Sequence, residues 1–68
     1  MKFEDALKAM REGNKVKRPL QSASKAMIHG KIFEVYKDWN HIVHYSKLDS
    51  MNCINIEADD WEVVDEHI

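Results

Sequence analysis

Cationic and hydroxyl side chains gather in one short polar stretch of the chain, between residues 17 and 25. The stretch holds Lys17, Arg18, Gln21, Ser22, Ser24 and Lys25. Guanidinium, ammonium and hydroxyl groups bind phosphate oxygens well. We therefore predict a site for a small anion, with Lys17 and Arg18 on phosphate and Gln21, Ser22 and Ser24 as polar contacts. No glycine-rich phosphate loop accompanies them.

A flat ring near such a site would stack on a nucleotide base. Tyr36 and Trp39 are the candidates for this stacking role. Trp39 lies in a polar stretch at 37–41 (K-D-W-N-H), which predicts an exposed turn. An exposed indole in a turn meets either a partner surface or a ligand, and the sequence leaves both open. Trp61 precedes two valines, and we expect it to be a core anchor that packs on the helix.

Other reactive residues do not form a catalytic or metal-binding pattern. His41 and His44 are three apart on a predicted strand, so their side chains point to opposite faces. Cys53 lies among apolar residues and is expected to be buried rather than nucleophilic. Asp59 and Asp60 diverge on extended backbone, and capping of a turn explains them better than catalysis. We expect no enzyme activity, no metal site and no cofactor.

Composition narrows the classes of partner. The chain has 68 residues and a net charge of −2, from 10 basic and 12 acidic residues. This balance argues against nonspecific binding to nucleic acid polymers, which needs excess positive charge. We expect one compact domain over 1–68. A chain of this size has a small core, so a homo-oligomer, a dimer or a tetramer, is the expected source of further stability.

The cysteine count and the lack of long apolar segments indicate the cellular compartment. The single cysteine excludes an intrachain disulfide and fits a reducing compartment. The sequence contains no run of 18 apolar residues and no apolar signal-peptide core. We therefore expect a cytoplasmic protein without a membrane partner.

Hydrophobic periodicity predicts an α+β fold with one N-terminal amphipathic helix packed on a small antiparallel sheet of four or five strands. Apolar residues at 3, 6, 7 and 10 mark one helix face over 3–12, and Gly13 supplies the stop. Strands are expected at 15–19, 26–29, 32–37, 41–46 and 61–64. Gly30 and Lys31 are the expected two-residue turn of a hairpin. The segment 48–55 shows no clear element, 57–60 should be a tight turn, and 65–68 should fray.

Three segments carry a family resemblance: 3–7 (F-E-D-A-L), 13–18 (G-N-K-V-K-R) and 58–64 (A-D-D-W-E-V-V). Together they resemble the family of small phage proteins that includes the second Thoeris anti-defence protein. Those proteins typically show F-x-x-A-L, then G-K-x-V-x-R, and end A-D-D-W-E-V-V. Many relatives carry a tryptophan shortly after the arginine, whereas this chain continues P-L-Q-S, so Tyr36 or Trp39 would take over stacking.

The resemblance implies a non-enzymatic sponge that assembles as a symmetric oligomer with pockets between subunits. Such proteins bind cyclic ADP-ribose isomers or cyclic oligonucleotides, the immune signals of Thoeris and CBASS defence, and keep the downstream effector inactive. The expectation for this chain is sequestration of such a signal without cleavage. The alternative is a protein–protein inhibitor of a host defence enzyme, acting through the Trp39 turn or the acidic tail.

Overall fold

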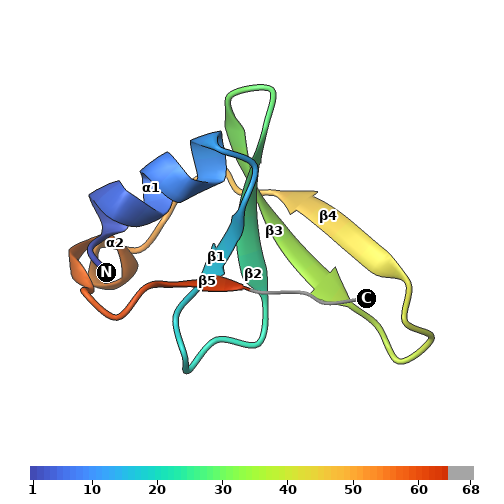
Figure 1. The fold of residues 1–68 in the computed structure, drawn as a ribbon. Coiled ribbons are helices and arrows are strands. Elements are labelled where there is room, and N and C mark those ends of the chain that lie inside the picture. Colours follow the sequence, from blue (N-terminus) through green and yellow to red (C-terminus); the bar gives the residue numbers. More distant parts are fainter. Residues whose placement is uncertain (65–68) are drawn as a thin grey trace.

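The structure, a computed structural model, describes residues 1–64. It shows an N-terminal helix packed on a five-stranded antiparallel sheet, which confirms the predicted α+β fold (Figure 1). The elements in chain order are α1 (Phe3–Arg11), β1 (Lys15–Lys17), β2 (Ser24–Ile28), β3 (Lys31–Lys37), β4 (Val43–Lys47), α2 (Cys53–Glu57) and β5 (Glu62–Val64). The strand order is β4-β3-β2-β1-β5, so the last strand pairs with the first.

Helix α1 begins and ends within one residue of the predicted range. Glu4 and Asp5 occupy its first turn, where negative charge favours the helix dipole, and Arg11 lies in its last turn. Gly13 follows with a φ of 96°, a left-handed conformation that glycine adopts without steric cost. The helix therefore ends where the sequence predicts it.

The core lies between α1 and the β1–β5 edge of the sheet. Ala6 and Met10 of α1 meet Val16 of β1 and Trp61, and all four are at most 2% exposed. The ring of Phe3 packs against Trp61 with 5.6 Å between centroids. The prediction that Trp61 anchors the core is confirmed.

Helix α2 was not predicted. The side chain of Asn52 caps it by accepting a 3.0 Å hydrogen bond from the Ile54 N–H. The indole nitrogen of Trp61 donates to the Asn55 carbonyl at 2.8 Å, which fixes α2 against the core. Cys53 lies on the exposed side of this short helix, so the expectation that it is buried was wrong.

The β2–β3 hairpin turns one residue earlier than predicted. Ile28 pairs with Lys31, so the two turn residues are His29 and Gly30 rather than Gly30 and Lys31. Both turn residues have positive φ, 52° and 76°, as in the type I′ turn that suits the twist of two-residue hairpins. The prediction failed because it allowed the left-handed conformation only to glycine.

The two faces of the sheet differ in cover. Side chains alternate between faces along a strand, so Val16, Lys25 and Glu34 share the face on which α1 packs. Ser24 and Val35, which pair with each other across β2 and β3, point to the other face, here called the open face. Figure 1 shows both helices beside the β1–β2 end, while β3 and β4 extend away as a hairpin. Within residues 1–64, the open face has no helical cover.

Candidate functional site

Two cavities flank the loop between β1 and β2, and Ser22 in that loop lines both. The open-face cavity, of about 240 Å³, is lined by Lys17, Ser22, Ser24, Val35, Tyr36, Lys37, Val43 and Val64. The Lys25 cavity, of about 310 Å³, lies on the helix side of the sheet and is bounded by the loop, β2, β3 and the segment that contains α2. The predicted polar residues therefore divide between two separate sites.

Strand register explains the lining of the open-face cavity. Val16 faces the helix, so Lys17 next to it points to the open face. Ser24 pairs with Val35 across β2 and β3, which places both on that face. The Ser24 hydroxyl donates to the Val35 carbonyl at 3.4 Å, and both side chains are buried as the floor. Lys37 is two residues beyond Val35 and so lines the same face.

The residues that line this cavity include two lysines, and Glu62 lies on the same face as the cross-strand partner of Lys17. Lys17 and Lys37 both line it, and no acidic residue does so among the residues that the structure describes. The ammonium of Lys17 donates to the Gln21 carbonyl at 3.4 Å. The buried Val35 side chain in the floor lowers the local dielectric, which strengthens attraction between these cations and an anion. The arrangement can hold a phosphate with ammonium and hydroxyl groups. Lys37 is a lining residue that was not among the predicted site residues.

Tyr36 lines the open-face cavity, but its ring is engaged on the opposite face. It stacks on His44 with 5.1 Å between centroids and an interplanar angle of 14°. Tyr36 and His44 are direct cross-strand partners, so the stack follows from the register. The outer part of the ring remains available, because Tyr36 is 45% exposed.

Trp39 lies at the tip of the β3–β4 hairpin and is 87% exposed, as predicted for the turn. The carboxylate of Asp38 fixes this tip. One oxygen accepts from the N–H groups of Asn40 and Ile42 at 2.9 and 3.1 Å, and the other contacts Nε2 of His44 at 2.9 Å. The hydrogen bond with His44, supported by the backbone N–H groups, lowers the pKa of Asp38. Trp39 lines neither of the two cavities described above.

Arg18 also lies outside the lining of both cavities. Its Nε donates to Oδ1 of Asp60 at 2.7 Å, and Nη2 donates to Oδ2 at 3.3 Å. Its Nη1 donates to Oδ1 of Asn55 at 3.0 Å. The hydrogen bond from Arg18 lowers the pKa of Asp60. Arg18 therefore ties the end of β1 to α2 and to the residue before Trp61, and its predicted contact with phosphate stays a prediction.

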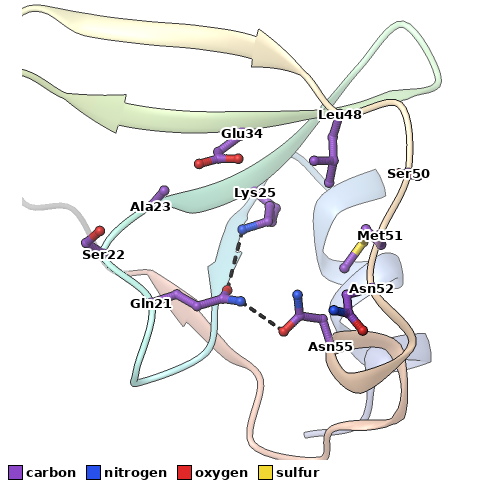
Figure 2. A pocket seen from close by; sticks show the side chains of 10 residues that line it. All are labelled: Gln21, Ser22, Ala23, Lys25, Glu34, Leu48, Ser50, Met51, Asn52 and Asn55. Atoms are coloured by element: carbon purple, nitrogen blue, oxygen red, sulfur yellow. Dashed lines mark hydrogen bonds between the residues drawn. The ribbon is translucent and has the colours of Figure 1, made fainter.

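A hydrogen-bonded row runs from this arginine into the Lys25 cavity, and Figure 2 shows its links from Asn55 through Gln21 to Lys25. Asn55 Oδ1, which accepts from Arg18, also accepts from Gln21 Nε2 at 3.0 Å. Gln21 Oε1 in turn accepts from Lys25 Nζ at 3.4 Å. Sequence reasoning selected Gln21 but neither Lys25 nor Asn55 as a site residue. Asn55 was missed because its helix was not predicted.

Within residues 1–64, no cluster of three or more histidine, cysteine, aspartate or glutamate side chains could hold a metal ion. None of the helices in that range is long and apolar enough to cross a bilayer. Comparison with protein-family models, with curated proteins and with solved structures found no match to this chain.

Proposed function

We propose that this protein binds a cyclic nucleotide signal, a cyclic ADP-ribose isomer or a cyclic oligonucleotide, and sequesters it without cleavage, as a phage-type anti-defence protein would. The observation that carries the proposal is the open-face cavity. It brings Lys17 and Lys37 together with the hydroxyls of Ser22 and Ser24 beside the buried side chain of Val35. Ammonium and hydroxyl groups around a phosphate account for binding, and sequestration requires no catalytic group.

The size of the cavity favours a shared site between two copies. Ligand pockets usually measure about 300–1,000 Å³, and the open-face cavity measures about 240 Å³. One copy would enclose the phosphate and sugar of one nucleotide, and a second copy would supply the remaining contacts. Tyr45, which is 53% exposed, and Phe33 lie on the same face and offer apolar surface for a two-fold interface.

Sequestration sets a requirement on affinity. A sponge must hold the signal at concentrations where the effector would otherwise respond, so a Kd near 1 nM, about −12 kcal/mol, is the expected range. Two copies that clasp one ligand double the number of cations and hydroxyls on it. Paired cationic contacts of this kind are salt-dependent, so binding should weaken as ionic strength rises.

The test separates binding from cleavage. The protein is incubated with each of a panel of cyclic ADP-ribose isomers and cyclic oligonucleotides, filtered to remove free ligand, and heat-denatured. Intact ligand should return to solution. Recovery of a cleaved product would show an enzyme instead, and a panel without any retained nucleotide would exclude the sponge.

Matched variants locate the site. Lys17→Met and Lys37→Met should each weaken retention at least tenfold, while Lys8→Met, which removes an exposed lysine from α1, should not change it. If all three variants retain the ligand as well as the wild type does, the ligand does not bind at the open-face cavity.

The hairpin tip supports a second candidate, a protein–protein inhibitor. Trp39 is 87% exposed and sits on a turn that Asp38 holds in place. A rigid exposed indole is the kind of residue that dominates binding at protein interfaces. Co-purification of one host enzyme that is lost in Trp39→Ala, with no nucleotide retained by the wild type, would favour this function.

A further inference from the structure

The Lys25 cavity contains a buried cation with weak protein partners. Lys25 is 6% exposed, although lysine is seldom buried to this degree unless it is paired. Among residues 1–64, its ammonium makes one hydrogen bond, a 3.4 Å contact to Gln21 Oε1, at the long end of hydrogen-bond geometry. Such a group has donor capacity left for a ligand, because an ammonium carries three donors.

A carboxylate faces the same cavity from the next strand. Glu34 is the direct cross-strand partner of Lys25, and both line the cavity. Figure 2 shows the Lys25 ammonium directed toward Gln21 and the Glu34 carboxylate lying apart from it. No ion pair joins the two among residues 1–64. The cavity thus presents one positive and one negative group side by side, neither neutralised by the other.

We propose that the Lys25 cavity binds a free α-amino acid in its zwitterionic form. The ligand carboxylate accepts from Lys25, and the ligand ammonium donates to Glu34. Directly opposed residues on antiparallel strands have Cβ atoms about 4.5–5.5 Å apart. In an α-amino acid the ammonium and the carboxylate are attached to the same carbon, so the two charges lie close enough together to meet a neighbouring ammonium and carboxylate. Leu48 and Met51 line the cavity and offer apolar surface to the ligand side chain.

The lining disfavours other classes of ligand. A nucleotide phosphate would meet Glu34, and repulsion from that carboxylate would offset attraction to a single ammonium. A neutral molecule would leave Lys25 without a counter-charge in a buried place, which is unfavourable. The volume, about 310 Å³, is at the small end of the range for ligand pockets and suits a small ligand.

This site is independent of the proposed sponge activity. Lys25 and Glu34 face the helix side of the sheet, and Ser24 and Val35, which floor the open-face cavity, point the opposite way. Experiments can therefore confirm or contradict nucleotide sequestration and amino acid binding separately.

The experiment is isothermal titration of the full chain with each of the twenty common L-amino acids at millimolar concentration. At least one should bind saturably. Its N-acetyl derivative and its carboxamide, each of which removes one charge, should bind at least tenfold more weakly. These comparisons use the wild-type protein, so they do not depend on a variant that folds. No binding by any of the twenty, or equal binding by a singly charged derivative, would overturn the proposal.

Variants then assign the two charges. Glu34→Gln keeps the shape of the side chain and should reduce amino acid binding at least tenfold, as should Lys25→Met. Lys8→Met, which removes an exposed lysine from α1, should leave it unchanged. A Glu34→Gln protein that is folded by circular dichroism and binds as well as the wild type would contradict the assigned geometry. Loss of amino acid binding in Lys17→Met with Lys25→Met unaffected would place the ligand in the other cavity.

Discussion

Arg18 is the residue on which the geometry near the loop depends. Its bidentate contact with Asp60 bridges 42 positions of sequence, and its remaining nitrogen holds the side chain of Asn55. Asn55 in turn orients Gln21 at the edge of the Lys25 cavity. A change at Arg18 is therefore transmitted to a cavity that Arg18 does not line.

We predict that Arg18→Ala lowers the melting temperature more than Arg11→Ala does. The first substitution removes the partner of Asp60 and one of the two donors to Asn55 Oδ1, whereas Arg11 is exposed on α1. Differential scanning fluorimetry of both variants measures the difference. Equal melting temperatures would show that the contact contributes no stability.

The same ion pair predicts a pH dependence. Because Arg18 lowers the pKa of Asp60 below its ordinary 3.8, the folded protein binds fewer protons than the unfolded chain in this range. The stabilisation is complete well above pH 3.8 and is lost as pH falls toward the lower folded pKa. Urea titrations between pH 3 and 6 should show a smaller acid-induced loss of stability in Arg18→Ala. The pKa of Asp38 is also lowered. Asp38 therefore contributes to the pH dependence of stability equally in the wild type and in Arg18→Ala.

At Trp39 the prediction is an effect on binding without an effect on folding. Its side chain is 87% exposed, so Trp39→Ala should change the free energy of unfolding by less than about 0.5 kcal/mol. Chemical denaturation measures this. A larger loss would mean that the indole packs within the protein, and the tip would then be no docking surface.

At the scale of the element, the β2–β3 turn shows how local chemistry sets register. His29 and Gly30 both adopt left-handed backbone, which costs an L-residue about 1–2 kcal/mol relative to the right-handed region. Asparagine tolerates this conformation better than most residues, and Asn-Gly is the favoured pair for such turns.

We therefore expect His29→Asn to raise the free energy of unfolding and Gly30→Ala to lower it by about 1 kcal/mol. A Cβ at Gly30 would meet no atom within 4 Å, so the loss would come from the backbone alone. Urea denaturation of the two variants tests both signs. A neutral Gly30→Ala would indicate a different turn conformation.

Elements differed in how far the sequence could predict them. Helix α1 was predictable because its apolar spacing and glycine stop agree over nine residues. Helix α2 has five residues, too few for periodicity to distinguish from a loop, and it depends on the Asn52 cap and on the bond from Trp61 to Asn55. The cavities were harder to predict than the helices. The positions of Lys25 and Lys37 in them depend on the pairing register between strands, and a single sequence does not encode that register locally.

Cross-strand register also explains why the predicted site residues are divided between two cavities. A polar stretch from 17 to 25 looks continuous in sequence, yet alternation sends Ser24 to the open face and Lys25 to the helix side. Arg18 pairs with Asp60, which no local pattern connects to it. The sequence shows which polar residues lie in this stretch, but it does not show which face of the sheet each side chain occupies.

At the scale of the whole molecule, the prediction concerns assembly through the open face. We predict a concentration-dependent oligomer in solution, because the partly exposed Phe33 and the exposed Tyr45 share a face without helical cover in residues 1–64. Tyr45→Lys should shift the species to monomer by light scattering. Ser46→Lys, at the next position and on the other face, is the matched control and should leave the oligomer intact. A wild type that stays monomeric at all concentrations would contradict the prediction.

The place of Trp61 has a consequence for biosynthesis. The bulkiest interior side chain belongs to the last tenth or so of the described chain, whereas the residues that enclose it, Phe3, Ala6 and Met10, are made first. A nascent polypeptide on the ribosome therefore lacks the indole that completes this core until residue 61 has been made. During that interval it would be most vulnerable to proteases and to capture by chaperones.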